Sequence, residues 1–239
     1  TMRRPGYLLN LAYISFQEAW DFQQAMHRKR VENLCPDTLL LVEHEPVFTM
    51  GRTTKEEHLK RNYDPKQEYE IAVYEIERGG SVTYHGPGQV VGYPIVRLRD
   101  YCPGPKSYVG MLQEVIIRVL SEWGIQGCLR KKLPGIWIEE GGNTDQKIAA
   151  IGVCIRRGVT MHGLSLNVNV DLKPFDFITP CGIEECQVTS MATLLGQHVN
   201  IPKVREQLAY HFAEVFGLDW NECRSTLPDL NSSSSPTPI

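Results

Sequence analysis

Short turns in the middle of the chain restrict the fold more than any other feature of the sequence. Residues 135–140, 147–155 and 159–171 are rich in apolar and β-branched residues, and they are separated by Gly141-Gly142-Asn143 and Arg156-Arg157-Gly158. Glycine-containing turns of this length join neighbouring antiparallel strands. The sequence therefore predicts an antiparallel meander here, and not a strict alternation of strands and helices.

The third of these segments has a period of two. Apolar side chains occupy every second position from Leu164 to Val170, and polar side chains occupy the positions between them. Successive side chains of a strand point to opposite faces, so one face is predicted to be buried. His162 has the parity of Leu164 and Leu166 and is predicted to share their buried face.

Helices are predicted where apolar residues recur three and four positions apart. Ser15 opens a capping-box pattern, and its helix runs to about residue 33 with Phe16, Ala19, Phe22 and Met26 on one face. Ser107 is predicted to cap a second helix that ends at Gly124. A short helix is predicted after Thr189, and Pro202 opens another. Further strands are predicted at residues 8–13, 38–43, 47–50, 72–76 and 89–98. This order favours an α+β fold with a mixed, largely antiparallel sheet flanked by helices.

Composition limits the kind of protein. The chain has 239 residues, of which 42% are hydrophobic and 22% charged, so we expect one domain over residues 1–230 and a disordered tail over residues 231–239. A net charge of −3 gives no general attraction for nucleic acid or an anionic membrane. We find neither a secretory signal nor an apolar run long enough to span a bilayer. The seven cysteines are scattered without a C-x-x-C pair, which favours a reducing, cytoplasmic location.

A glycine-rich stretch is the first candidate binding segment. Residues 78–88 carry glycines at 79, 80, 86 and 88 together with Arg78, Tyr84 and His85, and Gln89 follows. Glycine allows the backbone to approach a ligand closely. The spacing matches neither the dinucleotide-binding pattern nor the phosphate-binding loop. The alternative is a wide hairpin turn with Tyr84 packed and His85 in solvent.

Cys181 is the candidate nucleophile. It lies in the rigid turn Pro180-Cys181-Gly182, and Lys147 lies at the start of a strand with small residues after it. An ammonium group near the thiol would lower the pKa of Cys181, and the resulting thiolate would attack a carbonyl carbon, which indicates acyl transfer. Taken singly, a cysteine is more often a buried small residue, and a lysine at a strand end more often faces solvent.

Two rival sites use the same residue types. A cysteine protease would pair Cys181 with His85 or His162, but its signature sequences are missing. A metal site would combine Cys181 and Cys186 with these histidines, but their spacing is not that of metal ligands. We therefore expect no bound metal.

Three stretches carry long, ordered motifs: RGGSVTYHGPGQVVGYPIVRL at residues 78–98, KIAAIGVCIRRGVTMHGLSLNVNVDLKPF at residues 147–175, and ITPCG and VTS at residues 178–182 and 188–190. These stretches resemble the octanoyltransferase family, also called lipoate-protein ligase B. Weaker agreement at residues 41–52 and 134–138 extends the similarity over most of residues 41–190.

The resemblance implies a fold like that of biotin and lipoate protein ligases. It also implies transfer of an octanoyl group from acyl carrier protein to a lysine of a lipoyl domain. By motif, Cys181 forms the acyl-thioester and Lys147 lowers its pKa. The implied acyl and carbonyl pocket comprises Arg78, Gly79, Gly80, Ser81, Val82, Thr83, Tyr84, His85, Ala150, Ile151, Gly152, His162, Gly163, Leu164 and Ser165.

The implied chemistry needs no ATP and no cofactor. Exchange of one thioester for another costs little free energy, and the amide product is far more stable than either. Backbone N–H groups near the glycines would stabilise the oxyanion, and Lys147 would relay protons. The chain departs from the family pattern at Cys186, where glycine is usual, and at Cys154, where arginine is common. We expect Cys186 to pair with Cys181 on oxidation and so to make the activity sensitive to oxidants.

Two alternatives to this function stay open from the sequence. One is an ATP-dependent lipoate or biotin ligase on the same fold, and the other is a carrier-binding module without turnover. The expected partners are octanoyl-acyl carrier protein as donor, and lipoyl domains of 2-oxoacid dehydrogenase complexes and the glycine cleavage carrier protein as acceptors. Because such partners are typically acidic, Arg130-Lys131-Lys132 and Arg156-Arg157 are candidate docking charges, with an ordinary solvated surface as the alternative. A monomer is expected.

Overall fold

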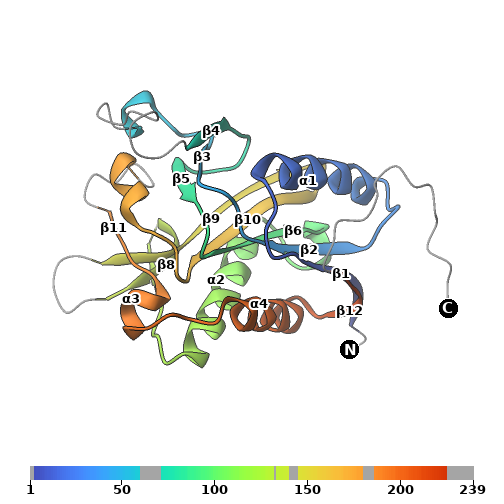
Figure 1. Ribbon diagram of the computed structural model, residues 1–239. Coiled ribbons are helices and arrows are strands. Elements are labelled where there is room, and N and C mark those ends of the chain that lie inside the picture. Colours follow the sequence, from blue (N-terminus) through green and yellow to red (C-terminus); the bar gives the residue numbers. More distant parts are fainter. Residues whose placement is uncertain (1–2, 60–70, 132, 140–144, 180–185, 225–239) are drawn as a thin grey trace.

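One large mixed sheet organises the molecule (Figure 1). The computed structural model describes residues 3–59, 71–131, 133–139, 145–179 and 186–224. The strands are β1 (Arg4–Asn10), β2 (Asp37–Val42), β3 (Val47–Met50), β4 (Ala72–Glu75), β5 (Val82–His85), β6 (Gln89–Ile95), β7 (Cys128–Arg130), β8 (Leu133–Ile138), β9 (Gln146–Arg156), β10 (Val159–Asn167), β11 (Gln187–Val188) and β12 (Leu218–Arg224). The helices are α1 (Phe16–Val31), α2 (Pro105–Glu122), α3 (Met191–Leu195) and α4 (Ile201–Phe216).

The large sheet has the strand order β12-β1-β2-β6-β10-β9-β8-β7, and β11 also pairs with β9. In this order, every neighbouring pair between β2 and β7 (β2-β6, β6-β10, β10-β9, β9-β8 and β8-β7) is antiparallel. In contrast, β1 runs parallel to both β2 and β12. The α+β fold and the antiparallel meander β8–β9–β10 are confirmed. A smaller sheet, β4-β3-β5, lies beside it.

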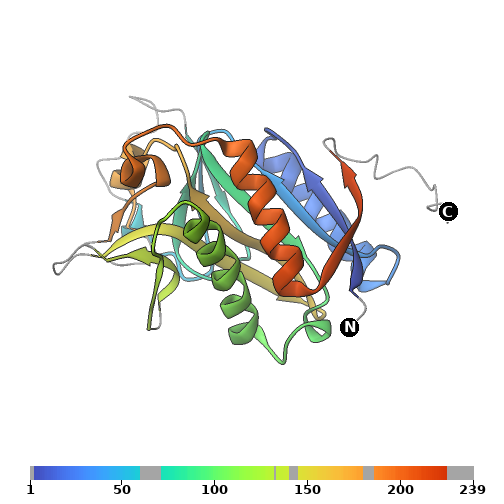
Figure 2. The ribbon, with the colours of Figure 1, turned by 90° about the horizontal axis from the view of Figure 1, so that it is seen from below.

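Helices cover both faces of the large sheet. Figure 2 shows α2 and α4 side by side across one face, with α1 on the other. Tyr108, Leu112 and Ile116 of α2 and Leu208 and Phe212 of α4 are fully buried in a single core with the sheet. On the opposite face, Ala19, Phe22 and Met26 of α1 pack against β2 and β6. The predicted buried face of the first helix is thus confirmed.

Local sequence sets where the helices begin. Ser15 accepts a hydrogen bond from the Glu18 N–H, and Glu18 accepts one from the Ser15 N–H, so the predicted capping box is present. The prediction that Ser107 caps α2 is wrong. The N-cap is Gly104, with Pro105 in the first turn, where proline loses no helical hydrogen bond. Asn200 caps α4 by accepting from the Lys203 N–H.

Several strand predictions needed correction. Strand β5 lies inside the glycine-rich stretch 78–88, where no strand is predicted, and β7, β11 and β12 are not predicted either. Strand β10 ends at Asn167, and all nine of its residues are buried, so burial extends to both of its faces and not to one alone. The cause is tertiary: α2 covers one face of this strand, and α1 covers part of the other. The predicted tail at residues 231–239 lies outside the described residues.

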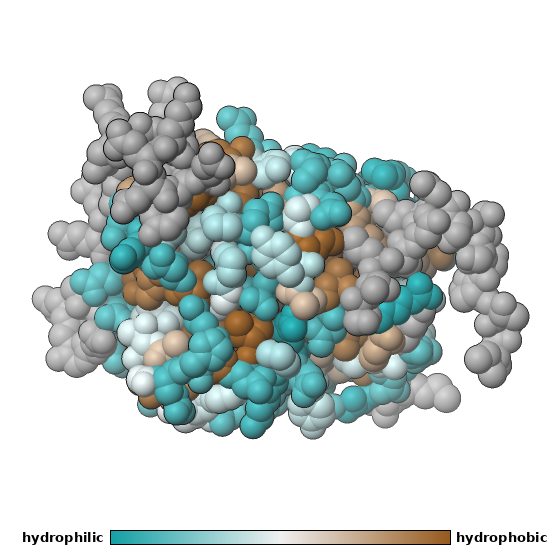
Figure 3. Space-filling model, viewed as in Figure 1, coloured by the Kyte–Doolittle hydropathy of each residue, from teal (hydrophilic) through white to brown (hydrophobic). Residues whose placement is uncertain are grey.

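The surface is of mixed polarity. On the face seen in Figure 3, hydrophobic residues form separate small areas among hydrophilic ones. Within the described part of the chain, no helix combines the length and the hydropathy needed to cross a membrane.

Candidate active site

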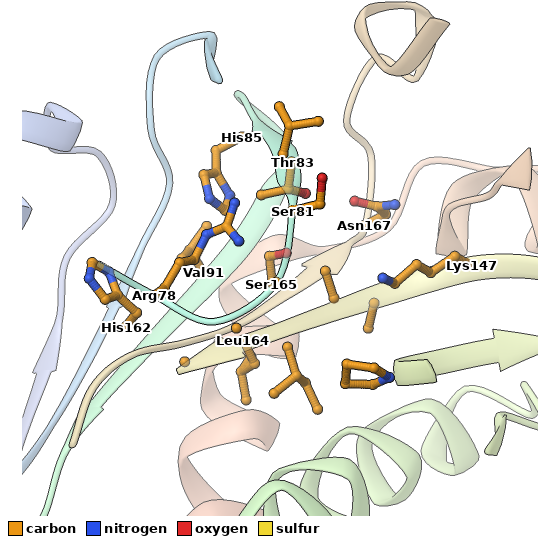
Figure 4. Close-up of a pocket in the computed structure, with 18 of the residues that line it drawn as sticks. Arg78, Ser81, Thr83, His85, Val91, Lys147, His162, Leu164, Ser165 and Asn167 are labelled. Carbon is orange, nitrogen blue, oxygen red and sulfur yellow. The ribbon is translucent and has the colours of Figure 1, made fainter. Parts of the chain in front are cut away.

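A cavity of about 790 Å³, its open mouth included, lies between the large sheet and the small one. Strands β5, β6, β9 and β10 supply most of its walls, and Figure 4 shows side chains from these segments converging on it. Most of the residues named for the pocket from sequence line it: Arg78, Gly80, Ser81, Val82, Thr83, His85, Lys147, Ala150, Ile151, Gly152, His162, Gly163, Leu164 and Ser165.

Three of the residues named from sequence are not among the described lining residues. Gly79 donates its backbone N–H to the Val153 carbonyl at 2.9 Å and thereby ties the glycine stretch to β9. Tyr84 is buried behind the wall, with its ring 5.7 Å from Phe48 and 5.5 Å from Phe175, centroid to centroid. Cys181 lies outside the described residues.

Sequence reasoning missed several residues of the wall, which are Phe16, Ile76, Val91, Tyr93, Pro134, Ala149, Asn167, Phe175 and Val188. Asn167 was detectable, because it has the parity of Ser165 on an alternating strand. The others are ordinary apolar or aromatic residues, and no local pattern distinguishes them from core residues.

Lys147 is buried, with 5% of its surface exposed, so the solvent-facing alternative does not hold. Its Nζ lies 5.5 Å from the centre of the Trp137 ring, and Val188 of β11 is its partner in the parallel pairing with β9. Gly135 makes room for it: the φ of this residue is +120°, and a Cβ there would lie 2.8 Å from Lys147 Cε. A lysine held in this way points its ammonium group along the cavity wall (Figure 4).

Described residues on both sides of the segment 180–185 are linked to the cavity wall, one through His58 and the other directly. The Thr179 N–H donates to the His58 carbonyl at 2.8 Å, and His58 Nδ1 lies 2.6 Å from the hydroxyl of Ser81, a lining residue. On the other side, Val188 itself lines the cavity and is the pairing partner of Lys147 on the neighbouring strand.

A chain of buried amides holds His85. Asn167 Nδ2 donates to the Thr189 carbonyl at 3.0 Å, so Asn167 Oδ1 is the acceptor for Gln89 Nε2 at 2.9 Å. Gln89 Oε1 then faces His85 Nδ1 at 2.7 Å, and this nitrogen must carry the proton. Burial, together with the nearby His44, lowers the pKa of His85 to about 3, so the ring is neutral.

His162 differs from its neighbours on β10. Its φ is +55°, an uncommon value for a residue with a side chain. Its ring lies 6.4 Å from Tyr93, and its Nε2 lies 3.6 Å from a Glu77 carboxylate oxygen. Leu164 and Leu166 instead join the core beneath α2, and Figure 4 shows His162 and Leu164 on opposite sides of the strand. The residue is buried as predicted, but not on the face that its parity indicated.

Burial and the contact between His162 and Glu77 set the charges around His162. Burial lowers the pKa of His162, and its proximity holds the pKa of Glu77 near 2. The Arg78 guanidinium donates to the Thr49 hydroxyl at 2.9 Å and to the Gly79 carbonyl at 3.0 Å. Among the residues that the structure describes, no cluster of three histidine, cysteine, aspartate or glutamate side chains is suited to a metal ion.

Comparison with known proteins shows the class of protein to which this fold and cavity belong. Residues 15–213 match the family described as the lipoyl protein ligase A/B catalytic domain. The bipartite lipoate protein ligase of Thermoplasma acidophilum superposes with a TM-score of 0.69 at 17% identity, over 93% of this chain and 88% of that one. Biotin protein ligase from Aquifex aeolicus shares the fold at a TM-score of 0.50 and 14% identity, over 89% of this chain and 70% of that one. The fold and its cavity therefore define a catalytic domain of the lipoyl ligase class.

Sequence similarity narrows this class. A protein from Syntrophobacter fumaroxidans named octanoyltransferase is 38% identical over 231 residues, which cover 97% of this chain and 98% of that protein. The chain belongs to the octanoyltransferase family.

Proposed function

We propose that this chain transfers an octanoyl group from acyl carrier protein to a lysine of a lipoyl domain through a thioester on Cys181. As a member of the octanoyltransferase family it is an acyltransferase. The observation that carries the proposed mechanism is the burial of Lys147 in the wall of a largely apolar cavity, where it pairs with Val188 of β11.

The first step is exchange of one thioester for another. The Cys181 thiolate attacks the thioester carbonyl carbon of the octanoyl carrier, a new carbon–sulfur bond forms, and the bond to the carrier thiol breaks. The Lys147 ammonium favours the thiolate before attack and gives a proton to the departing carrier thiolate.

The second step forms the amide. The amine of the acceptor lysine attacks the Cys181 thioester, the carbon–nitrogen bond forms, and the carbon–sulfur bond breaks. Neutral Lys147 takes the proton that the amine loses, which restores its ammonium form beside the thiolate. We propose that the lining residues named above form the pocket that binds the acyl chain and its carbonyl group. Backbone N–H groups of the glycine-bearing segments would donate hydrogen bonds to the oxyanion.

The proposal also covers the partner proteins and the cellular location. The donor carrier and the acceptor domain are expected to be acidic, and Arg156 and Arg157 are exposed at the β9–β10 turn, where they are available for docking. Arg130 is less suited to docking because it pairs with Asp145 and Glu139 of its own region. Lys132 lies outside the described residues. We propose action as a monomer in the reducing cytoplasm.

Intact-mass spectrometry after incubation with octanoyl carrier protein tests the mechanism. The wild type is expected to gain one octanoyl group without ATP, Cys181→Ser to gain none, and Lys147→Met to load about 100-fold more slowly. Lys203→Met is the matched control, because Lys203 Nζ lies 5.4 Å from the Trp123 ring but on the exposed surface. Equal loading of Cys181→Ser would contradict the thioester, and a requirement for ATP would favour the ligase alternative.

A further inference from the structure

Polar side chains line the end of the cavity away from Lys147. Figure 4 shows Arg78, His85 and His162 together at that end and Lys147 at the other. Tyr93 belongs to the same end, because its ring lies 6.4 Å from that of His162. In the proposed function the acyl carbonyl lies beside Lys147, so the methyl terminus of the chain would meet these polar groups. Their hydrogen bonds show how a hydrocarbon can be accepted there.

The Tyr93 hydroxyl is hydrogen-bonded to His44, which is fully buried. His44 Nδ1 lies 2.8 Å from the Ile14 carbonyl oxygen, which can only accept, so Nδ1 carries the proton. Burial lowers the pKa of His44 and raises that of Tyr93. His44 Nε2 is therefore unprotonated and accepts the Tyr93 hydroxyl proton across 2.9 Å. The single hydrogen of this hydroxyl is therefore donated to His44, which does not line the cavity.

The donors of His85 and Arg78 are also engaged. The Nδ1 proton of His85 goes to Gln89, and the Arg78 guanidinium donates to Thr49 and Gly79. Phe16, the first residue of α1, stacks on His85 with a centroid distance of 6.4 Å and an interplanar angle of 9°. Around Tyr93, His85 and Phe16 the far end therefore presents ring faces and carbon atoms although several of its side chains are polar.

We propose that His44 is a specificity-determining positioning residue, which draws the Tyr93 hydroxyl proton out of the cavity so that its far end receives the methyl end of a medium-length hydrocarbon chain. The inference rests on the proposed function. Without His44, the hydroxyl would have no buried acceptor, and an acyl chain entering this end would have to strip water from it. A chain too short to reach Tyr93 would not meet this cost.

The test compares butyryl, hexanoyl, octanoyl and decanoyl carrier proteins as donors. For His44→Leu, we expect kcat/KM for octanoyl transfer to fall by about tenfold, mainly through KM, because an unpaired buried hydroxyl is costly. Butyryl transfer should change less than about twofold. In the Tyr93→Phe background there is no hydroxyl left to satisfy, so adding His44→Leu should leave the octanoyl-to-butyryl ratio nearly unchanged.

The outcomes separate the two proposals. If His44→Leu lowers transfer of all chain lengths equally, or if its effect on the ratio persists in the Tyr93→Phe background, His44 only supports the fold and the inference is overturned. If the wild type transfers no acyl group from any carrier, the proposed function itself fails. Melting temperatures of the four proteins show which variants retain the native fold.

Discussion

At the scale of single residues, burial controls the charge of the histidines around the cavity. His85 is 6% exposed, and its pKa of about 3 lies well below the ordinary value of 6.5 because the ring is desolvated and lies beside His44. Between these two pH values the unfolded chain binds a proton at this residue and the folded chain does not. The stability that His85 contributes is therefore complete above pH 6.5 and is lost as the pH falls toward 3.

Replacing His85 should weaken this dependence on pH. His85→Asn keeps an amide N–H near the position of Nδ1, so the bond to Gln89 can persist. We expect the free energy of unfolding of this variant to fall less than that of the wild type between pH 7.5 and pH 5.0. Urea unfolding at the two pH values measures the difference. Equal losses in both proteins would show that the neutral His85 ring does not contribute to the acid sensitivity.

At this scale, the sequence predicted the candidate chemical groups better than it predicted the surroundings of their side chains. The strands of Lys147 and His162 were recognised, but burial of Lys147 depends on Trp137 and Gly135, which meet it only through the pairing of β8 with β9. The side of β10 on which His162 lies was mispredicted because a single positive φ reverses the parity. No local sequence pattern indicated the proposed role of Tyr93 and His44 in the cavity, since this role depends on a hydrogen bond between residues 49 positions apart.

At the scale of elements, helix ends test how local sequence is read. Ser15 caps α1 through a complete capping box, whereas Ser107 lies exposed inside α2 and caps nothing. Ser15→Ala should lower the free energy of unfolding by about 1 kcal/mol. Ser107→Ala should be neutral or slightly stabilising, because alanine has the higher helix propensity. Chemical denaturation of both variants measures this, and equal losses would contradict the assignment of Gly104 as the cap.

Strand β8 shapes the site through Gly135. A methyl group there would press on the Ala149 backbone and on Lys147 Cε, and the residue has a φ of +120°, which alanine adopts only with strain. Gly135→Ala should therefore lower both stability and octanoyl transfer. Gly110→Ala is the control, because nothing lies within 4 Å of a Cβ at that helical position, and it should stabilise α2 by about 0.5–1 kcal/mol. Normal transfer by Gly135→Ala would show that β8 does not set the position of Lys147.

The elements that sequence reasoning missed are those whose formation depends on distant partners. Strand β11 has two residues and exists through pairing with β9 at Lys147. Strand β12 forms by parallel pairing with β1, at the opposite end of the chain. The long periodic helices and the glycine-turn meander were predictable because their signals lie within 20 residues, although the ends of several strands were not.

At the scale of the whole molecule, the cavity and the β12 edge of the large sheet are separate. Figure 1 shows β12 near one end of the sheet and the small sheet that closes the cavity near the other. Trp220 of β12 packs on Phe212 with ring centroids 6.2 Å apart and donates its Nε1–H to the Ala209 carbonyl at 3.2 Å. These contacts join β12 to α4 without touching the cavity wall.

Trp220→Ala should consequently lower the free energy of unfolding by about 2 kcal/mol, less than a fully buried tryptophan because the side chain is partly exposed. Octanoyl transfer well below the melting temperature should stay at the wild-type rate, because Lys147 and the lining residues keep their places. Tyr210→Ala, which removes a side chain that is 60% exposed on α4, is the matched control and should change neither quantity. If transfer by Trp220→Ala falls at a temperature where the protein remains folded, the sheet transmits strain from its edge to the cavity, and the two regions are not independent.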